Sequence, residues 1–207
     1  MSFLIRVKTI GMGAAMALTL CSCASSPVHY YTLVSPAASA TTTHISAPFA
    51  IHVLPVGIPA QLDQQQMVVR SGTGTAAILD SERWVAPLGD ELRAALSSAL
   101  VEQLGARNLA GLPRSANQRV FSVRTQVRRF DAWPGRAVQF EADWVVGVQQ
   151  DILGPRISCS TRLDEAAPGG YADMVRVQQH MVERFAAQIA TTVRSFESGR
   201  PTCPGNA

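Results

Sequence analysis

The side chains of this sequence that could do chemistry are four cysteines, four histidines and two neighbouring carboxylates. Serine esterases present their nucleophile in a Gly-x-Ser-x-Gly turn, and the sequence contains no such motif. No spacing of Cys and His residues resembles a zinc site. His29, His44, His52 and His180 also lack an acidic or nucleophilic neighbour at a suitable spacing, so we interpret them as structural.

Glu141 and Asp143 lie on one face of a predicted strand because side chains alternate across a strand. Glycosidases use paired carboxylates. Alternation on a solvent-exposed face accounts for both residues without chemistry, however. We therefore predict no catalytic residue, no metal site and no cofactor.

The two N-terminal cysteines follow an export signal. Arg6 and Lys8 form a basic start, and residues 9–20 carry no charge. This run is shorter than the roughly 20 apolar residues of a transmembrane helix, and no later stretch qualifies. We expect an exported chain without a spanning helix.

Residues 20–23 decide which cysteine matters. Bacterial lipoprotein signals end in Leu, a tolerated residue, a small residue and the acylated Cys, and Leu20-Cys21-Ser22-Cys23 fits that order. Cys21 would place Leu20 next to the cleavage site. The alternative, that both thiols merely fill an apolar run, leaves this order unexplained. We predict lipid attachment at Cys23.

The residues after Cys23 indicate where the anchor lies. Ala24 stands where an Asp would retain a lipoprotein at the inner membrane of enteric-type bacteria, so we expect an outer-membrane, lipid-anchored protein that faces the periplasm. About seven residues precede the first predicted strand, a reach below ~25 Å. The domain should therefore sit close to the membrane.

Charge argues against a nucleic-acid partner. Removal of Arg6 and Lys8 with the signal leaves 16 arginines against 15 acidic residues, so the mature chain is near neutral. The densest basic cluster, Arg124, Arg128 and Arg129, lies in a predicted strand with Asp131. A solvated sheet face explains this cluster better than a phosphate-binding track.

Cys159 and Cys203 remain in the mature chain, and exported chains meet an oxidising compartment. A disulfide between them would attach the C-terminal tail to the sheet. The alternative is a buried free thiol at Cys159 and a free thiol in the tail at Cys203. The sequence leaves both open, because it does not show that the two residues are close.

Hydrophobic patterns predict the elements. Leucines recur every four residues from Leu88 to Leu104, after Pro87 and before Gly105, which indicates a core-facing helix. Apolar residues at three- and four-residue steps predict a second helix over about 171–196. Apolar runs and alternation predict strands at 30–34, 50–56, 67–70, 76–79, 119–133, 138–148 and 157–163, the last three as a meander.

This order predicts a single α+β domain in which two helices pack on one face of a mostly antiparallel sheet. We divide the chain into a signal peptide (1–22), a lipidated N-terminus with a first strand and linker (23–48), the domain (49–200) and a C-terminal tail (201–207).

Several short motifs follow one another in a characteristic order. They are a predicted lipidated cysteine followed by Tyr30-Tyr31-Thr32-Leu33, the segments at 53–59 and 66–70, and Glu82-Arg83-Trp84 with Pro87-Leu88 at the start of the helix. In this combination the sequence resembles the ABC-type transport auxiliary lipoproteins, the PqiC family. The resemblance implies that Tyr30, Tyr31, Leu33, Arg83, Trp84, Pro87 and Leu88 are characteristic structural positions. Trp84 would be a core aromatic at the start of the leucine helix.

The resemblance also implies a function. The protein would be a non-enzymatic component of an intermembrane lipid-transport system, with an MCE-domain protein and inner-membrane transporter components as partners, and would form a homo-oligomer. An assembly or stability factor for another outer-membrane machine is the alternative. A periplasmic hydrolase is the third hypothesis, which the missing nucleophile and base disfavour.

Overall fold

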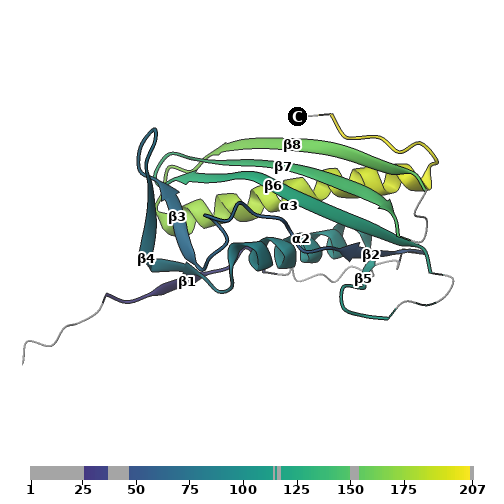
Figure 1. Ribbon diagram of the computed structural model, residues 1–207, viewed down its shortest axis with the longest axis horizontal. Helices are drawn as coiled ribbons and strands as arrows, with labels where there is room; N and C mark the ends of the chain where they lie inside the picture. Colours follow the sequence, from purple (N-terminus) through teal and green to yellow (C-terminus); the bar gives the residue numbers. More distant parts are fainter. Residues whose placement is uncertain (1–25, 37–46, 114, 116–117, 150–153, 206–207) are drawn as a thin grey trace, which may run out of the picture.

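A computed structural model describes residues 26–36, 47–113, 115, 118–149 and 154–205, in which eight strands form two sheets beside two helices (Figure 1). The elements follow in the order β1 (His29–Tyr31), β2 (Ala50–Val53), β3 (Gln66–Arg70), β4 (Ala76–Trp84), α2 (Leu88–Leu104), β5 (Arg107–Asn108), β6 (Val120–Trp133), β7 (Ala137–Val148), β8 (Arg156–Ala166) and α3 (Tyr171–Glu197).

The larger sheet has the strand order β5-β2-β6-β7-β8. The last three strands form the predicted antiparallel meander, whereas β2 runs parallel to both β5 and β6. Apolar residues of β7 alternate into the core, with Phe140 and Trp144 among the most deeply buried side chains. A register shift between Val127 and Arg129 changes the alternation of β6, so that Phe130 also faces the core.

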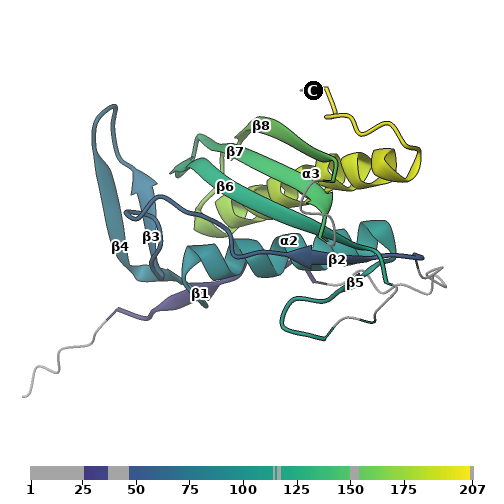
Figure 2. The same cartoon turned by 45° about the vertical axis from the view of Figure 1, so that its right-hand side comes forward.

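Both helices cover the same face of this sheet, and they contact each other along their length (Figures 1 and 2). The predicted leucine stripe of α2 is buried from Leu88 to Leu100. Gly105 ends the helix in the left-handed conformation, with φ at 60°, which a residue without a Cβ adopts at little cost. The buried stripe of α3 runs from Met174 to Phe196.

The smaller sheet has the order β1-β4-β3 and stands at one end of the molecule (Figure 2). β3 and β4 form a hairpin, and β1 adds to β4 as a parallel edge strand. Residues 26–28, the first that the structure describes, lead into β1 at this end. These residues, β1 and the β3–β4 hairpin therefore belong to one substructure.

The predicted α+β class, single domain and placement of the two helices are confirmed. The longest strand pairings are antiparallel, as predicted, but β1 and β2 pair in parallel, so both sheets are mixed, and there are two sheets rather than one. β4 continues to Trp84, beyond the predicted end at residue 79, because β1 pairs with its last three residues. The short β5 was not predicted, since two residues carry no periodic signal.

No helix in the part of the chain that the structure describes is long and apolar enough to cross a membrane.

Candidate functional site at the base of the N-terminal strand

The first described strand is held where the chain enters the domain from its N-terminal segment. β1 pairs with β4 in a parallel register that places His29 opposite Glu82 and Tyr31 opposite Trp84. The amide N–H of Val85 donates to the carbonyl of Tyr31, which extends the pairing past the end of the strand. β1 is thus part of the fold although it has only three residues.

Glu82 is the buried acidic residue of this pairing, with 7% of its surface exposed. His29 Nδ1 lies 3.0 Å from its Oε1. Burial raises the pKa of the Glu82 carboxyl, but the Tyr31 hydroxyl and the His29 imidazole lower it by more, so that its pKa lies below the usual value. Glu82 Oε2 is buried, and none of the described residues donates a well-aligned hydrogen bond to it.

Tyr31 shows the reciprocal effect. Its burial and then the neighbouring Glu82 carboxylate raise the pKa of the Tyr31 phenol to about 12. Ionisation of Tyr31 would place a second negative charge beside Glu82. The phenol therefore stays protonated well above the pH at which an ordinary tyrosine ionises.

Glu91 is a second buried carboxylate, with 5% of its surface exposed. Its Oε2 accepts hydrogen bonds from Thr32 Oγ1 at 2.7 Å and from the amide of Leu33 at 2.8 Å. Its Oε1 accepts from the amide of Ala86 at 3.2 Å. Because it lies in the first turn of α2, Glu91 also interacts favourably with the helix dipole. It ties the residues after β1 and those after β4 to the same helix.

α3 completes this clamp. Gln179 Nε2 donates to the carbonyl of Thr32 at 3.0 Å, and the hydroxyl of Ser35 donates to Glu183 at 2.6 Å. The segment 32–35 is therefore bonded to both helices. We name Glu82, Glu91 and Gln179 the N-terminal clamp.

The residues carried over from the family resemblance gather around the clamp. Leu33, Trp84 and Leu88 are buried in the core, and Tyr31 packs against it. Pro87 precedes α2, and its carbonyl accepts hydrogen bonds from the first turn. Tyr30 points to solvent, and Arg83 Nε donates to the carbonyl of Asp80. The sequence suggested these positions, with Glu82 beside Arg83, but it did not indicate that Glu82 and Glu91 are buried and bind the chain at β1.

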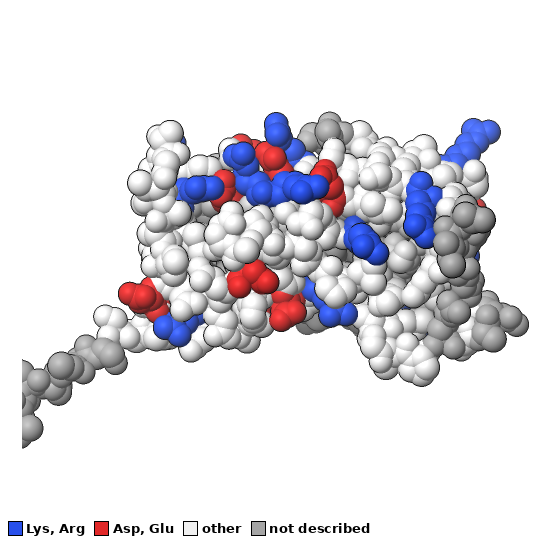
Figure 3. All heavy atoms as spheres, viewed as in Figure 1, with Lys and Arg blue, Asp and Glu red and all other residues white. Residues whose placement is uncertain are grey.

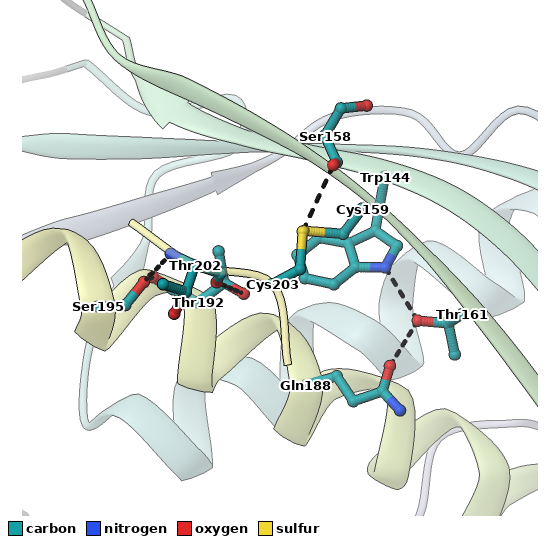
Figure 4. Close-up of a disulfide and its surroundings, with 9 residues drawn as sticks. All are labelled: Trp144, Ser158, Cys159, Thr161, Gln188, Thr192, Ser195, Thr202 and Cys203. Atoms are coloured by element: carbon teal, nitrogen blue, oxygen red, sulfur yellow. Dashed lines mark hydrogen bonds between the residues drawn. A yellow bond between two sulfur atoms is a disulfide. The ribbon is translucent and has the colours of Figure 1, made fainter. Parts of the chain in front are cut away.

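Cys23, the predicted lipid attachment site, lies outside the described residues. Cys159 on β8 and Cys203 in the tail are joined by a disulfide, with their Cα atoms 5.7 Å apart (Figure 4). The tail lies against α3, where Thr202 accepts a hydrogen bond from Thr192 and donates one to Ser195. The structure thus brings these two cysteines together.

Two histidines have carboxylate partners that the sequence did not indicate. His29 contacts Glu82, and His180 Nδ1 lies 3.1 Å from Glu165, which also binds Arg184. Among the described residues, neither imidazole is hydrogen-bonded to a hydroxyl or thiol that could act as a nucleophile. His44 lies outside the described residues.

The carboxylates of β7 belong to a network of ion pairs on the open face of the larger sheet. Asp143 pairs with Arg128 at 2.7 Å, and Glu141 pairs with Arg162 at 3.0 Å and Arg129 at 3.5 Å. Acidic and basic side chains accordingly gather together over the meander strands (Figure 3). The described residues contain no cluster of His, Cys, Asp and Glu side chains that could hold a metal ion.

A known protein family matches most of this chain. The model of the family described as "ABC-type transport auxiliary lipoprotein component" matches residues 31–190. The chain belongs to this family. The match begins at Tyr31, within the clamped strand, and ends inside α3. Transport auxiliary components are not a class of enzyme.

Solved structures share the fold. A crystal structure of an uncharacterized protein matches with a TM-score of 0.64 at 23% identity, over 81% of this chain and 99% of that chain. Protein XCC0632 from Xanthomonas campestris, of family DUF330, matches with a TM-score of 0.60 at 15% identity, over 83% of this chain and 98% of that chain. No curated protein sequence matches this chain.

Proposed function

We propose that this family member is an outer-membrane lipoprotein that serves as the periplasmic docking piece of an MCE/ABC-type intermembrane lipid-transport system. In this proposal residues 1–22 are the signal, Cys23 carries the lipid, residues 23–48 hold the first strand and linker, residues 49–200 are the auxiliary domain, and residues 201–207 are the tail. An MCE-domain protein and inner-membrane transporter components are its partners, and the protein acts as a homo-oligomer.

The N-terminal clamp carries this proposal. An acyl group on Cys23 would be six residues from the start of β1, a span of at most about 20 Å. Since the buried Glu91 and the partly buried Gln179 fix the chain immediately after β1, the domain would be held near the membrane. A scaffold held near a bilayer is suited to docking a transport conduit.

Lipid attachment is tested by intact-mass spectrometry of the membrane-extracted protein. The expected product starts at Cys23 and carries the mass of the acyl groups. Cys21→Ser is the matched control, because Cys21 leaves with the signal and its substitution should not change the mature mass. A mature chain that starts elsewhere, or that carries no lipid, contradicts the anchor.

The transport role is tested separately by purifying the detergent-extracted protein and identifying what is bound to it. We expect an MCE-domain protein encoded nearby to co-purify, and deletion of the gene to give an envelope phenotype. Sucrose-gradient fractionation should place the protein with outer-membrane markers. A lipidated protein bound instead to another outer-membrane machine would support the alternative role as an assembly factor.

A further inference from the structure

Exposed apolar side chains gather around β1, at the end of the molecule where the described part of the chain begins. Val28 is 42% exposed, Tyr30 61% and Val85 57%. Val28 and Tyr30 lie two residues apart and therefore on the same side of the strand. Val85 follows β4 directly, and its amide hydrogen bond to Tyr31 keeps it beside β1. We name these three residues the β1 patch.

The chain preceding the patch limits where it can lie. Tyr30 is seven residues from Cys23, so with a lipid on Cys23 it stays within about 25 Å of the membrane surface. No Asp, Glu, Lys or Arg occurs between Ala24 and Leu62. Contact of this segment with the bilayer therefore requires no charge to lose its hydration.

The N-terminal clamp determines which side of β1 faces outward. The side of β1 opposite the patch carries His29 and Tyr31, which interact with buried Glu82. The following residues are bonded to α2 and α3. β1 therefore cannot turn Tyr30 inward, and the patch stays on the outer side of the strand.

The composition of the patch suits a membrane surface. Tyrosine combines an apolar ring with a polar hydroxyl and is enriched where hydrocarbon meets headgroups. Arg83 lies opposite Tyr30 in the register of β1 and β4 and supplies a positive charge for anionic headgroups.

We infer that the β1 patch contacts the phospholipid headgroup region of the membrane that holds the anchor, and so orients the domain on the bilayer. This inference rests on the proposed lipid at Cys23. It assigns Val28, Tyr30 and Val85 as a second attachment point beside the acyl chains. The anchor supplies most of the affinity, and the patch sets the orientation.

The test uses tryptophan fluorescence of the full-length lipidated protein in phosphatidylethanolamine and phosphatidylglycerol liposomes, brominated near the headgroup end of the acyl chains. Tyr30→Trp places the probe in the patch. Ile78→Trp in β4 and Leu112→Trp after β5 are matched controls, because their native side chains are 60% and 58% exposed. The wild type gives the background of its three native tryptophans.

We expect brominated lipid to remove about half of the emission added by Tyr30→Trp, since interfacial side chains lie within the headgroup and acyl boundary. The emission added by the two control substitutions should change little. Equal quenching of all three probes in protein shown by mass to be lipidated would overturn the patch and leave the anchor intact. Absence of the lipid would overturn both.

A second copy of the chain is the other occupant that the test distinguishes. If a partner copy covered the patch, Tyr30→Trp would show concentration-dependent shielding from a soluble quencher in detergent, without any bilayer. That result would overturn membrane contact at this patch.

Discussion

Glu82 and Glu91 are charged side chains buried near the start of a long helix, and both serve the segment that leads to the N-terminus. Burial of a carboxylate is costly unless hydrogen bonds or charges compensate it. Glu91 obtains this compensation from one hydroxyl and two backbone amides, and Glu82 from His29 and Tyr31. The two buried carboxylates therefore favour one position of residues 29–33, because that position supplies the groups that compensate them.

Replacing Glu91 by alanine should destabilise the domain by about 2–4 kcal/mol, because it leaves the buried amide of Leu33 and the Thr32 hydroxyl without their acceptor. Urea unfolding followed by circular dichroism measures the change. Glu102→Ala on the exposed side of the same helix is the matched control and should stay within about 0.5 kcal/mol. Equal effects of the two substitutions would show that the clamp does not contribute to stability.

The raised pKa of Tyr31, about 12, predicts an alkaline loss of stability. The folded state holds the phenolic proton more tightly than the unfolded state, whose pKa is near 10. The contribution is therefore complete below pH 10 and is lost as the pH rises toward 12. No lysine occurs after Lys8, so few other groups titrate in this range.

Urea unfolding measured between pH 9 and about 12 checks this expectation, since the slope of stability with pH counts the protons released. Tyr31→Phe should flatten the decline, whereas Tyr30→Phe, at an exposed position, should leave it unchanged. If the unfolding free energy of Tyr31→Phe still fell with rising pH, the loss of stability would come from another titrating group.

At the scale of elements, the sequence predicts those helices and strands whose apolar residues recur at regular spacing. The four-residue leucine spacing of α2 and the alternation of β7 appear at the predicted places because each periodicity is imposed by one buried face. The parallel pairing of β1 with β4 has no such signal, because its partners lie 53 residues apart and the register is set by tertiary contacts. Asp90 and Glu91 look alike as first-turn acids, yet only Glu91 is buried, since the chain after β1 covers it.

The disulfide between Cys159 and Cys203 attaches the C-terminal tail to β8. Reduction of the disulfide, or Cys203→Ser, should lower the unfolding free energy by about 2–4 kcal/mol, because the bond restricts a long loop of the unfolded chain. Urea unfolding with and without reductant measures the difference. The unfolding free energy of Cys203→Ser should not change when reductant is added. If the unfolding free energy of the wild type did not change either, the disulfide would not form in the protein.

At the scale of the whole molecule, exposed apolar residues and ion-paired charged residues lie on different surfaces. The β1 patch lies at one end of the molecule, while the open face of the larger sheet carries arginines paired with acidic residues. Because Arg128 and Glu141 already have partners, this face presents little net charge. After the proposed removal of residues 1–22 the chain would carry 16 arginines and 15 acidic residues, a balance that gives no strong electrostatic attraction to an anionic membrane.

Membrane attachment should therefore resist salt. At about 1 M salt the screening length is near 3 Å, so attachment through surface charges would be lost, whereas acyl chains in hydrocarbon are unaffected. We expect washed membranes to retain the protein at low and high salt alike. The Cys23→Ser variant, exported with a signal peptide of the ordinary, non-lipoprotein kind, should appear in the soluble fraction at both salt concentrations. Release of the lipidated protein by salt alone would mean that a charged partner, rather than the anchor, holds it at the membrane.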